Sequence, residues 1–308
     1  CRNQYRLHKG FHYPRGVNTI KESKEAAEAF EKHFSNCVFK KYNNYYAISQ
    51  DDSKVEFDDY IRILRDNNLK FEIQNPKNIH LRNVQGAVLS NENLYCPRLL
   101  KSEVEKRLKS SKVRTLLSTS FDVSNEDKFD KIILAAYSNN EFLAQQFGLK
   151  LDVDRRYQIV EKPVLKCQGA IKDLSLVIMD GPFMSLDPLA GTNMSVMGHV
   201  VEAVHEQKVG NVGFQISKNP NLNSLLPSFY SSKYIEIIEA GKYFLPELST
   251  GFYEKSMWAI RSVANNPRTD DRISEISVLS DKVISIFSGK ISSCIKVASK
   301  IKDYIDAA

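Results

Sequence analysis

The pattern of apolar residues changes twice along the chain, and this constrains the fold more than any other sequence feature. Residues 84–136 and 282–305 alternate between strand-like and helix-like stretches, which favours a parallel sheet. Between them, residues 157–168, 174–180 and 194–205 are rich in Val, Ile, Leu and Met and are separated by turn residues. A run of strands without intervening helices is typical of an antiparallel sheet. The sequence therefore predicts a mixed α/β (α+β) fold.

The order of these stretches predicts two interleaved domains. The parallel α/β domain takes residues 1–16, 84–150 and 268–308, and the antiparallel-sheet domain takes residues 17–83 and 151–267. Because ligands of such parallel sheets bind at the carboxyl ends of the strands, we expect the binding crevice to be assembled from distant segments.

Local patterns predict the individual elements. Helices are expected at residues 20–34, 55–68, 228–246 and 291–305, and another begins at Pro97. Strands are expected at residues 84–90, 112–117, 119–123, 131–136, 252–264 and 282–287, and two short strands at 37–49 with Asn43-Asn44 as their turn.

Composition excludes several classes of protein. The 308 residues are 42% hydrophobic and 26% charged, which excludes a disordered chain. The net charge of +6 is mild and spread along the chain, so we expect no nucleic-acid partner. The five cysteines form no CxxC pair, which fits a reducing compartment, and no apolar run approaches the roughly 18 residues of a membrane span. We expect a cytoplasmic protein that acts on a small molecule, without a membrane.

The first residues form the densest motif. Residues 2–15, RNQYRLHKGFHYPR, hold three arginines, two histidines, three aromatic residues and two amides. Arginine forks and amides suit phosphate or carboxylate recognition, although a basic surface loop has the same composition. His8 and His12 have the i, i+4 spacing of a helical zinc site, but Gly10 and Pro14 oppose a helix. We therefore expect no metal site.

Two later segments end strands with small or polar residues. The apolar run 132–135 leads into Ala136 and Tyr137, and the strand 282–287 leads into Ser288-Gly289-Lys290 before the last helix. Small residues let a backbone approach a ligand, and a helix amino terminus attracts anions through free N–H groups. Each segment is equally consistent with a plain turn. Asp180 and Asp187 are interpreted as turn residues.

These segments, in this order, resemble the FAD-dependent oxidoreductases of the D-amino-acid oxidase and glycine oxidase superfamily. Residues 2–15 are similar to the phrase NNQxRxHxGYHYPR of a bacterial branch of that superfamily. The likeness continues at residues 41–42, 45–48, 133–137, 179–183 and 286–290, and so spans essentially the whole chain.

One departure from the superfamily is large. Its members open with a strand, a GxGxxG turn, a helix and an acidic residue that holds the adenosine ribose, and this sequence contains none of them. Because the sequence starts at Cys1, directly before the motif, we expect a truncated chain that lacks a unit of about 30–40 residues. The resemblance implies FAD as cofactor and an incomplete Rossmann-like domain. The departure implies weak or no FAD binding by this chain.

The resemblance also implies roles for residues. Hydride would pass from a C–H next to an amine or hydroxyl to the flavin. The cofactor would contact Asn3, Gln4, Arg6, His8, Ala136, Tyr137, Ser288, Gly289 and Lys290. The substrate would contact His12, Tyr13, Arg15 and, as a weaker assignment, Tyr46. No catalytic residue is assigned.

Two alternatives stay open at this point. The missing dinucleotide motif also fits a non-catalytic binding or scaffold protein that has lost the cofactor. A metal hydrolase using His8 and His12 needs a third ligand, and the sequence offers no convincing one.

Overall fold

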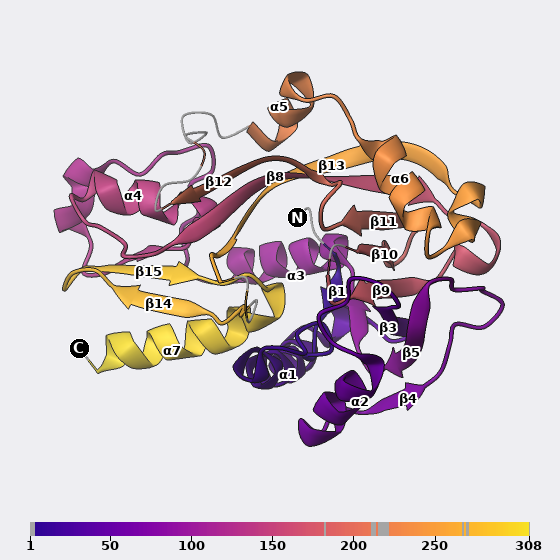
Figure 1. Ribbon diagram of the computed structural model, residues 1–308. Helices are drawn as coiled ribbons and strands as arrows, with labels where there is room; N and C mark the ends of the chain where they lie inside the picture. The colour runs from indigo at the N-terminus through magenta and orange to yellow at the C-terminus, as the bar shows by residue number, and fades with distance from the viewer. Residues whose placement is uncertain are drawn as a thin grey trace.

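The computed structural model describes residues 4–181, 183–210, 214, 222–266, 268 and 271–307. Within these residues the strands form three sheets, and helices cover the largest sheet on both faces (Figure 1). The strands are β1 (Arg6–Leu7), β2 (Val38–Phe39), β3 (Asn44–Ser49), β4 (Phe71–Ile73), β5 (Val84–Ser90), β6 (Asn93–Tyr95), β7 (Ile132–Leu134), β8 (Arg155–Lys166), β9 (Ser175–Met179), β10 (Met184–Pro188), β11 (Met194–His199), β12 (Val204–Gly210), β13 (Phe252–Ala264), β14 (Glu275–Val278) and β15 (Val283–Phe287). The helices are α1 (Val17–His33), α2 (Phe57–Asp66), α3 (Pro97–Ser110), α4 (Asn140–Gln146), α5 (Leu222–Phe229), α6 (Tyr234–Lys242) and α7 (Cys294–Asp306).

The largest sheet has the order β12-β8-β11-β10-β9-β3-β5-β4, and β13 pairs with β8 as well. Its pairs are antiparallel except for β3 and β9, which run parallel. The predicted antiparallel character of the middle of the chain is therefore confirmed. Both faces of β3 are buried, and accordingly none of the residues in its sequence, NYYAIS, is charged.

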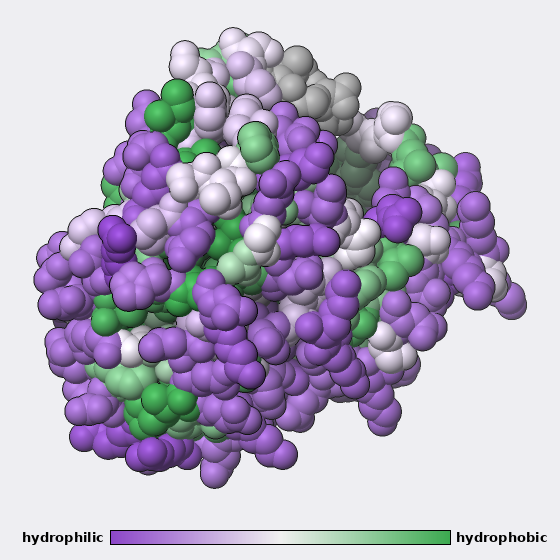
Figure 2. Space-filling model, turned by 90° about the vertical axis from the view of Figure 1, so that its right-hand side faces the viewer, coloured by the Kyte–Doolittle hydropathy of each residue, from purple (hydrophilic) through white to green (hydrophobic). Residues whose placement is uncertain are grey.

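Different elements cover the two faces of this sheet. On one face, Phe11 and Ile20 pack with α2 against Tyr46 and Val177. On the other face, α6 and the segment after it pack against the alternate residues of the same strands. The molecular face that carries α6 and β4 is mostly hydrophilic and shows only separate, smaller apolar patches (Figure 2). The side chains of the sheet that face the core are therefore shielded by amphipathic elements.

The third sheet carries the parallel pairing that the sequence predicts. Strand β15 pairs parallel with β7 and antiparallel with β14, while α7 and α1 lie side by side (Figure 1). The predicted strand 282–287, its turn and the last helix are confirmed, and so are α1, α2, β5, β13 and a helix that begins at Pro97.

Two predicted strands are wrong. Residues 112–117 and 119–123 form no strand, and Val113, Leu116 and Leu117 are exposed. An apolar stretch becomes a strand only where a neighbouring strand pairs with it, and none does so here. The strand–helix–strand unit predicted to begin with β5 is wrong for the same reason, because β5 pairs antiparallel with β3 and β4.

Three further predictions need correction. The two strands in 37–49 do not pair with each other, because β2 pairs with β6 and β3 pairs with β5 and β9. The helix predicted at 228–246 is replaced by the shorter α6, and Ser232 before it binds Glu161 through its hydroxyl. Asp187 lies in strand β10 rather than in a turn. Across the described part of the chain, no helix combines the length and apolar character needed to cross a membrane.

Helix α6 packs closely on the sheet through Gly241. A Cβ added there would collide with Met197 Cε and would lie 2.8 Å from Leu248 Cδ1. We predict that Gly241→Val lowers the free energy of unfolding by about 1–3 kcal/mol through overpacking, measured by urea denaturation. Glu239→Val introduces the same residue on the exposed side of α6 and should change stability by less than about 0.5 kcal/mol. Equal effects of the two substitutions would contradict this packing.

Candidate functional site

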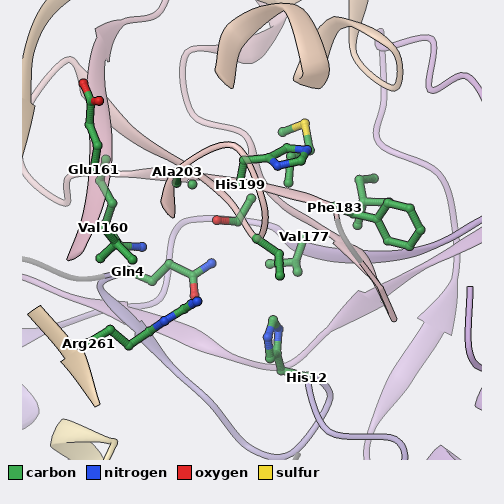
Figure 3. Close-up of a pocket in the computed structure, with 15 residues that line it drawn as sticks. Gln4, His12, Val160, Glu161, Val177, Phe183, His199, Ala203 and Arg261 are labelled. Atoms are coloured by element: carbon green, nitrogen blue, oxygen red, sulfur yellow. The ribbon is translucent and has the colours of Figure 1, made fainter. Parts of the chain in front are cut away.

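An open cavity lies between the large sheet and the N-terminal segment (Figure 3). Its polar lining comes from Gln4, His12, Glu161, Lys162, Ser185, His199 and Arg261, and its apolar lining includes Val160, Val177, Phe183 and Ala203. An apolar wall and a few convergent polar groups are usual properties of a small-molecule site. This cavity is therefore the candidate functional site.

The floor of the cavity is one row of residues across neighbouring strands. Ser185 on β10 lies opposite Val177 on β9 and Gly198 on β11. Continuing the register of β8 and β11 by two residues aligns Gly198 with Lys162. Because residues in such a row share a face of the sheet, Lys162, Ser185 and Val177 all line the cavity. Glu161, one residue away, points away from the cavity centre (Figure 3).

The opposite wall comes from the N-terminal segment. His12 points from its loop toward the cavity, while the ends of Gln4 and Arg261 point toward one another (Figure 3). Burial lowers the pKa of His12 well below the usual range, and interactions with His8 and Arg6 lower that pKa further. His12 is therefore neutral at pH 7, and its Nδ1 is buried without a hydrogen-bond partner.

A buried network fixes the residues that precede His12. Glu92 accepts hydrogen bonds from the Tyr46 hydroxyl at 2.6 Å and from the Lys9 backbone N–H at 2.5 Å. His8 Nδ1 lies 3.1 Å from the same hydroxyl. Burial by itself raises the pKa of Glu92, but contacts with His8, Arg6 and Tyr46 hold that pKa below its ordinary value. The carboxylate is thus charged at neutral pH and holds three segments together.

Arg6 is a buried structural cation. Its Nη2 donates to Asp187 Oδ1 at 2.8 Å and to Ser175 Oγ at 2.5 Å, and its guanidinium lies 4.7 Å from the centre of the Tyr46 ring. The side chains of Arg6 and Asp187 are fully buried. Arg6 is therefore buried against strands β9 and β10 of the large sheet, and the Asp187 carboxylate compensates its charge.

Arg15 also has a protein carboxylate as its partner. Its Nε and Nη2 donate to the two oxygens of Asp180 at 2.5 and 3.3 Å. This fork ties the end of the N-terminal segment to the residue that follows β9. Asp180 was interpreted as a turn residue, and its role in the structure is this ion pair.

The segment after β7 contacts the end of β15. Tyr137 stacks on Phe287, with ring centres 5.3 Å apart, and its hydroxyl donates to the Ser262 carbonyl on β13. Asn140 accepts from the Ala136 N–H at 2.6 Å and donates to the Ile286 carbonyl at 2.7 Å. Ala136 and Tyr137 therefore lie against the strand that leads to Ser288.

The loop after β15 reaches the N-terminal segment. Lys290 Nζ lies 4.2 Å from the centre of the Tyr13 ring and donates to Ser23 Oγ at 2.7 Å. Ser288 Oγ lies 3.1 Å from Ser274 Oγ, whereas a Cβ added to Gly289 would meet no atom within 4 Å. The backbone of this loop is therefore accessible beside Tyr13.

The structure thus brings the three sequence segments together. His8, His12, Tyr13 and Tyr46 form one ring cluster, in which His12 lies 5.1 Å from Tyr13 and 6.2 Å from Tyr46 between ring centres. Lys290 contacts Tyr13 of this cluster, and Tyr137 stacks on Phe287, three residues before Lys290 in the chain. Asn3 lies outside the described residues.

Sequence reasoning missed most of the cavity lining, namely Lys162, Ser185, Gly198, His199 and Arg261. One signal was present. Glu161-Lys162 is a charged pair inside the otherwise apolar stretch 159–165, and charged residues in a buried strand need a partner or a function. Glu161 has partners, since it accepts from His205 Nε2 at 2.9 Å and from the Lys233 N–H at 2.8 Å.

The chain is similar to known proteins in sequence and in structure. No family model matches the chain. The FAD-dependent monooxygenase FPY4 of Fusarium mangiferae is 23% identical over 306 residues, which cover 99% of this chain and 80% of that protein. Glycine oxidase from Geobacillus kaustophilus superposes with a TM-score of 0.63 at 11% identity, covering 95% of this chain and 79% of its own. L-α-glycerophosphate oxidase from Mycoplasma pneumoniae, solved with FAD bound, gives 0.61 at 14% identity over 94% of this chain and 78% of its own. The chain therefore has the mixed α/β fold of the FAD-dependent oxidoreductases related to D-amino-acid oxidase.

The buried Arg6–Asp187 pair generates a stability prediction. We predict that Arg6→Met lowers the free energy of unfolding by about 3–5 kcal/mol, because it leaves the Asp187 carboxylate buried without its cation. Chemical denaturation at neutral pH measures the loss. Lys302→Met, which removes an exposed pair with Asp306, is the matched control and should cost less than about 1 kcal/mol. A small effect of Arg6→Met would show that the pair does not anchor the N-terminal segment.

Proposed function

We propose that this protein is an FAD-dependent oxidoreductase that removes hydride from a C–H next to an amine or hydroxyl of a small substrate. One observation carries the proposal. The three segments that resemble flavin-binding segments contact one another in turn, Tyr137 with Phe287 and Lys290 with Tyr13, and the first of them lines the cavity on the large sheet through Gln4 and His12.

The residues at this point fit the flavin ring. His12 Nδ1 is buried without a partner, and a planar ligand with polar edges offers one. The backbone at Gly289 is free of side-chain contacts, so it can approach a ligand closely. His12 and the backbone of residues 288–290 would hold the ring, with the Ala136-Tyr137 turn behind them. Bound FAD supplies the acceptor for the hydride.

The chain itself contributes positioning and electrostatics. Neutral His12 can donate or accept one hydrogen bond without adding a charge beside the ring. Backbone N–H groups of the 288–290 loop, ahead of α7, would stabilise negative charge that develops on the ring. Val160, Val177 and Phe183 give the substrate an apolar wall that limits water.

The structure changes what the candidate residues are expected to do. The guanidinium groups of Arg6 and Arg15 already bind the carboxylates of Asp187 and Asp180, so we propose that both arginines position the N-terminal segment. His8 and Tyr46 belong to the Glu92 network and would shape the wall from behind. The non-catalytic scaffold alternative is not favoured, because the solved structures with this fold are named as an oxidase and a dehydrogenase, and the relative in sequence is named as a monooxygenase.

The proposal predicts a flavin that substrate can bleach. Because the sequence contains no GxGxxG turn and weak binding is expected, FAD is added in large excess. The purified protein should then show a shifted flavin absorbance band, and amines or hydroxy compounds should bleach it without oxygen. His12→Leu should weaken FAD binding about three- to tenfold, because it removes one hydrogen bond, as measured by fluorescence titration. His80→Leu on the exposed surface is the matched control and should bind FAD like the wild type. An unchanged FAD spectrum in the presence of the protein would refute the proposal.

A further inference from the structure

A buried chain of hydrogen bonds runs from Glu92 through Tyr46 to His8. Glu92 comes from the segment between β5 and β6, Tyr46 from β3, and His8 from the segment after β1. Tyr46 Oη lies 2.6 Å from Glu92 Oε2 and 3.1 Å from His8 Nδ1. Because the hydroxyl has a single proton, it can donate to only one of these two neighbours.

The proton of the Tyr46 hydroxyl points to Glu92. Burial alone would raise the pKa of Glu92, but hydrogen bonds and charges from His8 and Arg6 hold that pKa below its ordinary value. The carboxylate is therefore ionised and can only accept. Burial and the Glu92 charge raise the pKa of Tyr46 well above its ordinary value, so the hydroxyl keeps its proton. Arg6 lies over the Tyr46 ring, and a guanidinium offers no acceptor that could compete for this proton.

The direction of this bond decides where His8 carries its ring proton. A lone pair on His8 Nδ1 would face the lone pairs of Tyr46 Oη at 3.1 Å, and Glu92 Oε2, a second acceptor, lies 3.7 Å from the same nitrogen. A neutral imidazole has one N–H and one acceptor nitrogen, and the hydrogen bond made by one nitrogen sets the role of the other. In the neutral His8 ring, Nδ1 is therefore the donor and Nε2 the acceptor.

The Nε2 atom is the end of the chain that a ligand can reach. The His8 side chain is 12% exposed, and no residue in the described part of the chain forms a hydrogen bond with its Nε2. Unlike His12 Nδ1, this nitrogen is not among the buried atoms without a partner. The centre of the His8 ring lies 5.3 Å from that of His12 and 5.9 Å from that of Tyr13. His8 thus presents an acceptor beside the rings of the proposed flavin site.

We infer that Glu92 and Tyr46 are positioning residues that hold the ring proton of His8 on Nδ1, so that Nε2 accepts a hydrogen bond from a donor group of bound FAD. The place of the ring proton follows from the buried network alone, whereas the contact with the cofactor rests on the proposed function. With the proton on Nε2 instead, His8 would face the cofactor as a donor and the accepting role would be lost.

Nitrogen-15 NMR of protein labelled at its histidines detects the ring proton directly. The spectrum is recorded at about pH 9, well above the ordinary histidine range, and His8→Gln identifies the His8 signals. We expect the wild type to favour Nδ1–H over Nε2–H at His8 by about tenfold or more, as a hydrogen bond supported by a charged group predicts. The exposed His80 is the reference in the same spectrum. A wild-type His8 protonated mainly on Nε2 would overturn the inference.

Glu92→Gln keeps the shape of the side chain and reverses the chain of hydrogen bonds. The Lys9 backbone N–H, which donates to Glu92 Oε1 at 2.5 Å, retains the amide oxygen, so the amide nitrogen turns to Tyr46. Tyr46 then accepts from this amide and donates to His8 Nδ1, which moves the ring proton to Nε2. Glu72→Gln at an exposed position of β4 is the matched control and should leave His8 unchanged. A folded Glu92→Gln protein that keeps the Nδ1–H form would contradict the role of Glu92.

Added FAD separates this inference from the proposed function. In large excess, FAD should shift the nitrogen-15 resonance of His8 Nε2 upfield, because a hydrogen bond forms there, and should leave that of Nδ1 in place. An unmoved Nε2 resonance in a protein whose flavin absorbance band shifts would overturn the contact with the cofactor and retain the oxidoreductase proposal. A His8 ring held as Nδ1–H in a protein that binds no FAD would refute the proposed function and retain the role of Glu92 and Tyr46.

Discussion

The contact between Arg6 and Asp187 determines where the N-terminal segment lies. Arg6 comes from the short strand β1, and Asp187 and Ser175 come from neighbouring strands of the large sheet. The desolvation cost of two buried charges offsets much of their attraction, so the pair adds less stability than specificity. Its consequence is positional, because it places His8, His12 and Tyr13 against the sheet and so forms one wall of the cavity.

The cavity then follows from two elements with different chemistry. The sheet supplies a rigid floor whose row of residues is set by strand register, and the loop supplies aromatic rings and a neutral histidine. Glu92 connects them by binding Tyr46 of the sheet and the Lys9 backbone of the loop. Since sites on rigid elements hold their geometry best, the floor is the part suited to recognise the substrate.

The sequence predicts some of this arrangement and not the rest. Helices α1, α2 and α7 and strands β5, β13 and β15 are local patterns, so periodicity and turn residues were sufficient. Residues 112–123 have strand-like composition but no strand to pair with, and pairing is not visible in local sequence. Arg6 and Arg15 have the composition of anion-binding residues, yet their partners Asp187 and Asp180 lie more than 160 residues away. The floor of Lys162, Ser185 and Gly198 depends on register between three strands, which only the folded structure reveals.

A crystal structure of the protein grown with saturating FAD tests the central claim most directly. The claim is that the N-terminal segment and the large sheet together enclose a flavin-dependent substrate cavity. The account predicts that the flavin ring contacts His12 and the backbone of residues 288–290, with the cavity open between the ring and the row that contains Lys162 and Gly198. A flavin ring bound elsewhere, with no contact to these residues, would contradict it.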